Sequence, residues 1–169
     1  MMNVQIRPFD SKDIPEMARA FDEIGWNKPA SQYEVYLAEQ TFRLRDVYVA
    51  TIQGQFAAYL TIAWKSSYEP FRTAGIPEIT DFNVLPKFRR QGIGTRLMDQ
   101  AEDVTARISS IAGIGVGLTP DYGAAQRLYV LRGYVPNGLG VYYKDRPIHF
   151  GEEIKVDDHL VLYLTKECI

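Results

Sequence analysis

The chain has 169 residues, a length that fits one globular domain. Hydrophobic residues make up 46% of it and charged residues 24%, which excludes a largely disordered chain. The net charge is −2, so a protein that grips nucleic-acid backbones is not expected. The single cysteine, Cys168, excludes an internal disulfide framework and a thiolate-rich zinc site. The two histidines match no metal spacing, and we expect no metal site.

Targeting and membrane signals are also missing from the sequence. The first ten residues contain no apolar region of the kind that signal peptides carry. The longest uncharged stretch, 47–64, is interrupted by a Gln-Gly-Gln turn and indicates two strands. We therefore expect a cytoplasmic protein without a membrane partner.

Hydrophobic periodicity predicts seven strands and four helices in chain order. The predicted strands cover 4–9, 47–52, 56–64, 77–85, 111–118, 140–144 and 160–165. The predicted helices cover 11–24, 31–40, 92–108 and 122–132. Ser31 and Glu34 are expected to form a capping box, and 65–75 is expected to be a loop. Strands and helices in this order predict an α/β or α+β domain with a mixed sheet over 1–169.

The segment after the fourth predicted strand is the most informative part of the chain. Pro86 ends the strand, a basic turn follows, and Gly92 and Gly94 lie where the next helix begins. A helix N-terminus offers free N–H groups, and glycines let a bulky anion approach the backbone. This predicts a phosphate or pyrophosphate cradle, although a plain strand-to-helix turn is the alternative. The P-loop pattern and the third glycine of a dinucleotide fingerprint are both absent.

Two motifs carry a resemblance to a known family. The run RRQGIG at 89–94 is similar to the R/Q-x-x-G-x-G/A signature of the GNAT superfamily of N-acetyltransferases. The run AQRLYVLRGY at 125–134 resembles the second helix motif of that family, A-x-x-L-Y-x-x-x-G-F/Y. The resemblance implies a single GNAT-like domain with a mostly antiparallel sheet of about seven strands and about four flanking helices.

The resemblance further implies acetyl-CoA as co-substrate and an amine as acceptor. Backbone amides in the first motif would hold the pyrophosphate, and the strand end before it would pair with the pantetheine arm. The cofactor-binding residues implied are Phe82, Asn83, Val84, Arg89, Arg90, Gln91, Gly92, Ile93, Gly94, Thr95 and Tyr122. The Phe82 amide would polarise the thioester carbonyl. Tyr122 stands where many family members carry an asparagine.

The resemblance and the need to deprotonate an amine together indicate three catalytic candidates. Tyr129 matches the family's tyrosine, which protonates the leaving thiolate. Glu78 and Asp81 are the carboxylates of the fourth predicted strand, and either one, or water, is a candidate base. Regular alternation would put them on opposite faces of the strand, with Glu78 on the same face as Thr80 and Phe82.

The acceptor is expected to contact the first two predicted helices, the loop between them and the loop after the third predicted strand. These supply aromatic residues, among them Trp26, Tyr33, Tyr36, Tyr68 and Phe71. Aromatic rings with occasional acids suit a cationic small molecule or peptide amine. The leading hypothesis is an N-acetyltransferase acting in a ternary complex, and the family suggests a homodimer. The alternatives are a non-catalytic acyl-CoA sensor and a nucleotide-dependent enzyme.

Overall fold

A computed structural model describes residues 3–168, which contain eight strands and five α-helices. The strands are mostly antiparallel to their neighbours, which confirms the predicted α/β class. Contacts divide the chain into two compact units. Unit 1 comprises residues up to 64 together with 79–104, and unit 2 comprises 65–78 together with residues from 105 onward. That 1–169 forms a single domain stays a prediction.

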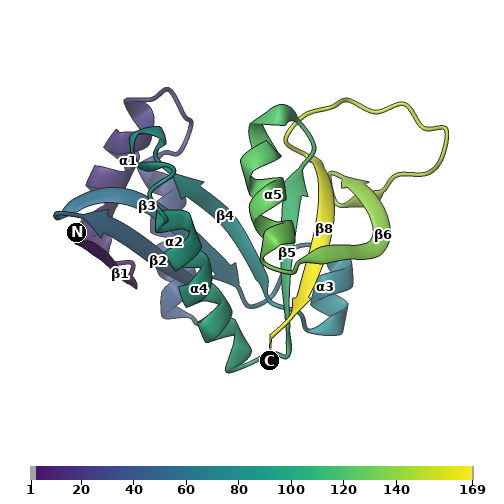
Figure 1. Ribbon diagram of the computed structural model, residues 1–169, viewed down its shortest axis with the longest axis horizontal. Helices are drawn as coiled ribbons and strands as arrows, with labels where there is room; N and C mark the ends of the chain where they lie inside the picture. Colours follow the sequence, from purple (N-terminus) through teal and green to yellow (C-terminus); the bar gives the residue numbers. More distant parts are fainter. Residues whose placement is uncertain (1–2, 169) are drawn as a thin grey trace. The chain divides into compact units, whose positions relative to one another are not determined.

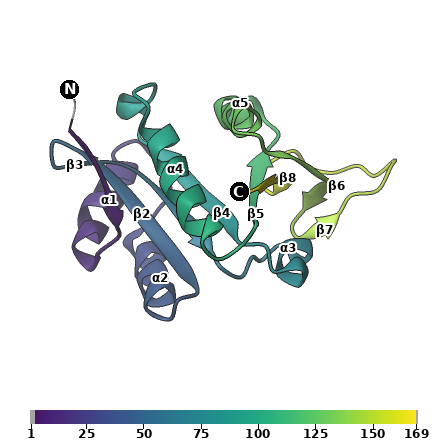
Figure 2. The same cartoon turned by 60° about the horizontal axis from the view of Figure 1, so that its bottom comes forward.

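Unit 1 contains four neighbouring strands and three helices. The strands, in spatial order, are β1 (Val4–Pro8), β2 (Arg45–Ile52), β3 (Gln55–Ala63) and β4 (Glu78–Val84). The helices are α1 (Ile14–Asp22), α2 (Ala30–Thr41) and α4 (Ile93–Ala106). Figure 2 shows α1 and α2 on one face of these strands and α4 on the other. Between the strands and the α1–α2 pair lies a core rich in aromatic rings, including Phe21, Tyr33, Phe56 and Tyr59.

Two local expectations for unit 1 have different outcomes. The β2–β3 turn is tight, and Gln53 and Gly54 both have positive φ, as a two-residue hairpin turn requires. The capping box expected at Ser31 and Glu34 is absent, because α2 already begins at Ala30 with Pro29 at its N-cap. A capping box forms instead before α1, between Asp10 and Asp13.

Unit 2 contains four neighbouring strands and two helices. The strands, in spatial order, are β5 (Ile111–Gly117), β8 (Leu160–Glu167), β6 (Val135–Tyr143) and β7 (Arg146–Pro147). The helices are α3 (Glu69–Ala74) and α5 (Gly123–Leu131), and Figure 1 shows α5 beside β5 and β8. The expected loop at 65–75 is therefore wrong in part. Helix α3 begins at Glu69 with Pro70 in its first turn, Phe71 is its buried residue, and Gly75 ends it in the left-handed conformation.

Strand β6 is longer than the predicted segment 140–144. Its pairing with β8 is irregular between Pro136 and Val141, where Gly138 and Gly140 have positive φ. This bulge breaks the alternation that marks a strand in a sequence.

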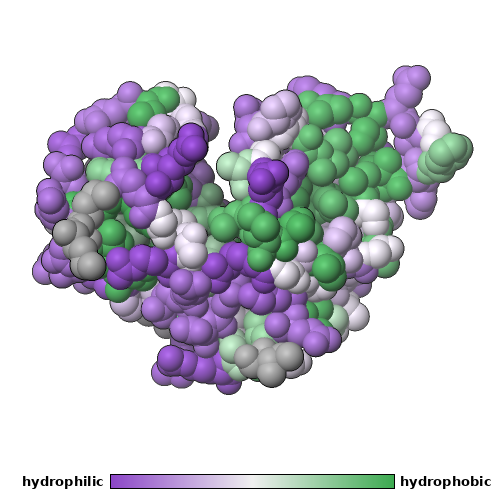
Figure 3. All heavy atoms as spheres, in the orientation of Figure 1, coloured by the Kyte–Doolittle hydropathy of each residue, from purple (hydrophilic) through white to green (hydrophobic). Residues whose placement is uncertain are grey.

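Exposed apolar residues gather over the part of unit 2 that holds α5, β6 and β8 (Figure 3). They include Val130, Leu131, Val135 and Leu139. Among residues 3–168, no helix combines the length and apolar character that crossing a membrane requires.

Strand β5 carries three glycines on one face, and aromatic rings lie against it. A Cβ at Gly113 would come within 2.3 Å of the Phe71 ring, and one at Gly117 within 2.4 Å of the Tyr122 ring. At Gly115 the contact would be 2.9 Å, to Tyr163. The rings of Tyr68 and Tyr163 stack with centroids 3.6 Å apart beside Phe71, so this face of β5 forms part of the core of unit 2.

We expect Gly113→Ala to destabilise the protein by about 1–3 kcal/mol, because the added methyl group overlaps the Phe71 ring in a packed core. Urea unfolding followed by circular dichroism measures this loss. The control is Gly123→Ala at the start of α5, where a Cβ meets nothing within 4 Å. Equal midpoints for the two variants would contradict the close packing of Phe71 on β5.

Candidate active site

The connection between β4 and α4 is an exposed loop with special backbone geometry. A 3-10 turn at Pro86–Phe88 follows the strand, and Arg90 and Gly92 have φ of +61° and +74°. Residues 89–92 are exposed, whereas Ile93 is buried and anchors the first turn of α4. The loop therefore presents backbone to solvent at the point where the helix begins.

Gly94 brings this helix close to the end of β4. A Cβ at Gly94 would lie 3.0 Å from the tip of the Phe82 ring and 3.6 Å from Val84. Phe82 and Val84 thus face the first turn of α4, and a Cβ at position 94 would require the Phe82 ring to shift. The close contact between the first turn of α4 and the Phe82 ring explains why position 94 of the motif is a glycine.

Arg89 holds the loop against unit 1. Its Nε donates a hydrogen bond to the Val84 carbonyl at 3.1 Å. Its guanidinium lies 5.7 Å from the centre of the Trp26 ring. The side chains of Lys87, Arg90 and Arg96 add positive charge on exposed positions around the same turn.

These features together suit a bulky anion. The first N–H groups of an α-helix have no acceptor within the helix, and its N-terminus carries the positive end of the dipole. Exposed arginines and two glycines, Gly92 and Gly94, lie where α4 begins, and they add positive charge and access to the backbone. The residues present at this turn therefore fit a pyrophosphate group such as that of the acetyl-CoA which the sequence resemblance implies.

Asp81 lies immediately before Phe82 and interrupts the regular alternation of β4, since its φ is +49°. A positive φ is uncommon for a residue other than glycine and is often found at functional sites. Its carboxylate accepts hydrogen bonds from five side chains of unit 1. The donors are Lys28 Nζ at 2.7 Å, Asn83 Nδ2 at 2.8 Å, Gln32 Nε2 at 2.9 Å, Tyr36 Oη at 2.9 Å and Tyr59 Oη at 2.6 Å.

The partners of Asp81 decide its charge. Burial alone would raise its pKa, but the Lys28 ammonium and the hydrogen bonds from Lys28, Tyr59 and Tyr36 outweigh burial and hold the pKa below its ordinary value. Asp81 is therefore a carboxylate with both oxygens occupied. Such a group binds a cation well and takes up a proton poorly.

The other two catalytic candidates belong to unit 2. Glu78 is 7% exposed and accepts a short hydrogen bond from the Ser66 hydroxyl, which itself accepts from the Tyr68 N–H. Tyr129, on α5, is also buried. Burial raises the pKa of the Tyr129 phenol, with a smaller contribution from Tyr122, so the phenol keeps its proton at neutral pH.

Tyr122 is held by its own unit. Its ring packs on Gly117, and its hydroxyl donates to Asp158 at 2.9 Å. The structure therefore places the implied residues 82–84 and 89–95, together with Asp81, in unit 1, and Glu78, Tyr122 and Tyr129 in unit 2.

A family model supports the same interpretation. The model described as "Acetyltransferase (GNAT) family" matches residues 12–140, which is most of the chain. The chain belongs to the GNAT family of acetyltransferases. No curated protein sequence matches it.

Solved structures share the fold at low sequence identity. The protein yncA from Salmonella typhimurium, solved with its cofactor acetyl-CoA, is 17% identical with a TM-score of 0.70, covering 98% of this chain and 94% of that one. A ribosomal-protein-alanine N-acetyltransferase from Brucella melitensis is 20% identical with a TM-score of 0.70, covering 96% and 99%. An N-acetyltransferase from Staphylococcus aureus is 13% identical with a TM-score of 0.72, covering 99% of both chains. These likenesses establish the GNAT fold.

The aromatic residues expected to meet an acceptor divide into two groups. Tyr33, Tyr68 and Phe71 are fully buried in the cores of their units. Trp26 and Tyr36 remain partly exposed, and Tyr36 contacts Asp81. Only this second group is available to an acceptor without rearrangement.

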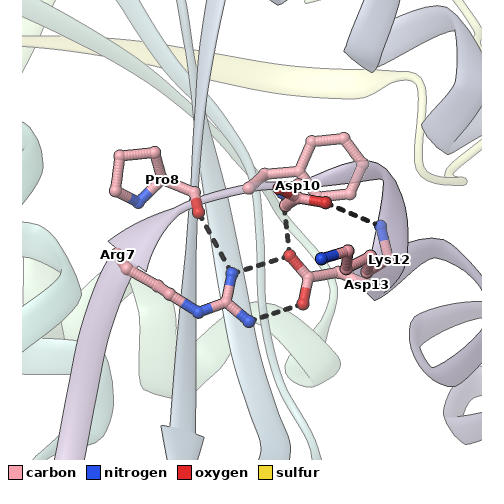
Figure 4. Close-up of a pocket in the computed structure, with 6 residues that line it drawn as sticks. Arg7, Pro8, Asp10, Lys12 and Asp13 are labelled. Carbon is pink, nitrogen blue, oxygen red and sulfur yellow. Dashed lines mark hydrogen bonds and ion pairs between the residues drawn. The ribbon is translucent and has the colours of Figure 1, made fainter.

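A separate depression lies at the end of β1 and contains none of the predicted site residues (Figure 4). Its polar groups satisfy one another. The Arg7 guanidinium donates to both carboxylate oxygens of Asp13, at 2.8 and 2.6 Å, and Asp13 also accepts from the Asp10 N–H. These contacts fix the chain in the segment just before α1, so we interpret the depression as part of the fold and not as a binding site.

We expect Gly94→Asp to weaken acetyl-CoA binding at least tenfold, because it adds bulk and negative charge at the start of α4. Calorimetric titration with acetyl-CoA measures the affinity. Gly94→Ala separates bulk from charge, and Gln55→Asp places the same charge at an exposed position beside the β2–β3 turn. Unchanged affinity in a folded Gly94→Asp variant would contradict the cradle.

The low pKa of Asp81 predicts a pH dependence of stability. A carboxyl with a depressed folded-state pKa stabilises the fold above its unfolded pKa of about 4, and this stabilisation is lost as pH falls. We expect Asp81→Asn to cost about 1–3 kcal/mol at pH 7 and progressively less below pH 4. Urea unfolding from pH 7 to 3 measures the difference, with the exposed Asp22→Asn as control. A cost independent of pH would contradict the ionised state of Asp81.

Proposed function

We propose that this GNAT protein is an N-acetyltransferase that moves the acetyl group of acetyl-CoA to a primary amine on a small molecule or peptide. The observation that carries the proposal is the β4–α4 connection. An exposed basic loop, a helix N-terminus and a glycine closely packed on the strand end occur there together. Membership of the GNAT family supports acetyl transfer as the reaction.

In the proposed function, main-chain groups of unit 1 bind the cofactor. Amides within 90–95 hold the pyrophosphate, and the positive φ of Arg90 and Gly92 shapes the loop that presents them. The backbone of 82–84 pairs with the pantetheine arm. The Asn83 side chain donates to Asp81, so its contribution to the cofactor is through its main chain.

The proposed catalytic roles divide the proton movements between two groups. When bound, acetyl-CoA supplies an acetyl thioester that an uncharged amine attacks directly. The Phe82 N–H polarises the thioester carbonyl. Tyr129 gives its proton to the departing sulfur, and its raised pKa keeps that proton available at neutral pH. Tyr122 is proposed only to line the cofactor arm, because its hydroxyl is already bonded to Asp158.

Glu78 is our choice of base over Asp81. Asp81 is paired with an ammonium, and both of its oxygens accept hydrogen bonds, which disfavours proton uptake. Glu78 accepts a hydrogen bond from the neutral Ser66 hydroxyl, and we propose that it takes the proton of the attacking amine. The cytoplasmic location and the homodimer remain predictions.

Two variants test the roles of Tyr129 and Glu78. We expect Tyr129→Phe and Glu78→Gln each to lower kcat at least tenfold while acetyl-CoA affinity stays within threefold of wild type, because each removes a proton donor or acceptor. Release of free thiol over a panel of amines measures turnover, and calorimetry measures affinity.

Tyr134→Phe is the matched control, since Tyr134 is a buried tyrosine whose ring lies 6.1 Å from that of Tyr129. It should keep near wild-type kcat. Binding of acetyl-CoA without turnover on any amine would favour the sensor hypothesis and contradict the proposed enzyme.

A further inference from the structure

Lys28 belongs to the loop between α1 and α2, and its side chain reaches Asp81 on β4. The Nζ–Oδ1 distance is 2.7 Å, and the two side chains are 17% and 18% exposed. Nζ also lies 5.9 Å from the centre of the Phe21 ring and 5.7 Å from that of Tyr59. The ammonium thus has a carboxylate as its counter-ion and two aromatic rings beside it.

These are the components of a site for an alkylammonium ion. A carboxylate supplies the charge, and ring faces attract cations within about 6 Å. The carboxylate does not depend on Lys28 alone, because it also accepts from the neutral donors Gln32, Tyr36 and Tyr59. These donors would keep Asp81 ionised and oriented if another cation replaced Lys28.

The location of this site is suited to controlling the choice of acceptor. Asp81 directly precedes Phe82, whose amide is proposed to polarise the thioester, and the pair is partly open to solvent. An acceptor with a second positive charge would be attracted to the Asp81 carboxylate. Lys28 already occupies that carboxylate and repels a second ammonium.

We propose that Lys28 is a specificity-determining residue, which fills an ammonium site on Asp81 and thereby excludes acceptors that carry a second cationic group. The acceptor class is then a monoamine or an N-terminal amine with no cation a few bonds from the reacting nitrogen. The role in specificity rests on the proposed function, whereas the ammonium site itself does not.

The binding test removes the Lys28 side chain and adds a free amine of the same structure in solution. 1-Aminobutane reproduces the lysine side chain from Cβ outward, and 1-butanol is its uncharged counterpart. We expect Lys28→Gly to bind 1-aminobutane at least tenfold more tightly than wild type does, with no gain for 1-butanol, in calorimetric titrations without acetyl-CoA. The double variant Lys28→Gly/Asp81→Asn should lose the gain. The exposed Lys12→Gly is the control.

Thermal unfolding by circular dichroism shows whether the variants fold. Lys28→Ala, which keeps only the Cβ of the lysine side chain, is measured in the same way should Lys28→Gly fail to fold. Equal 1-aminobutane affinity in wild type and the folded Lys28 variant, or a gain that survives Asp81→Asn, would overturn the ammonium site.

The specificity test compares two acceptors of equal length. 1,4-Diaminobutane and 4-amino-1-butanol differ only in whether the far end is an ammonium or a hydroxyl group. We expect the ratio of their kcat/KM values to rise at least tenfold in favour of the diamine in Lys28→Gly. An unchanged ratio would overturn the specificity role. Absence of acetyl transfer with the 1-aminobutane gain intact would overturn the proposed function and leave the ammonium site standing.

Discussion

The Asp81 carboxylate is the interaction on which unit 1 depends. A charged group so little exposed is tolerated only when it is paired and hydrogen-bonded, and here five donors serve one carboxylate. The donors come from the α1–α2 loop, α2, β3 and β4 itself. One side chain therefore links helices and strands that are distant in the chain. Its positive φ also sets the direction in which the backbone of β4 continues toward the β4–α4 loop.

Most elements of this fold were predictable, because amphipathic periodicity is a local property. The hairpin at Gly54, the start of α4 near Gly92 and the end of α5 before Gly133 all follow from turn and cap chemistry. The exceptions have physical causes. Helix α3 is only six residues long and too short for periodicity to show. In β6, a bulge removes the alternation, so only its second half resembles a strand in the sequence.

The candidate site was predictable where it is continuous in sequence and not where it is assembled by folding. Arg89, Gly92 and Gly94 lie in one motif, and their geometry agrees with an anion cradle. The network around Asp81 draws on Lys28 and Tyr59, which share no spacing rule with it. The sequence signal for that network was only an excess of aromatic residues near the first two helices. The bond between Ser66 and Glu78 likewise joins residues whose pairing no motif records.

One face of β5 carries only glycines, and this affects how unit 2 folds. Glycine has a low intrinsic preference for strands, because it loses much backbone freedom and offers no side chain to pack. With Gly113, Gly115 and Gly117 on one face, the stability of β5 must come from the rings of Phe71, Tyr163 and Tyr122 that cover it. Those rings come from segments on both sides of β5 in the chain. In kinetic terms, we therefore expect β5 to become ordered late, after its aromatic cover has assembled, and not to nucleate the folding of unit 2.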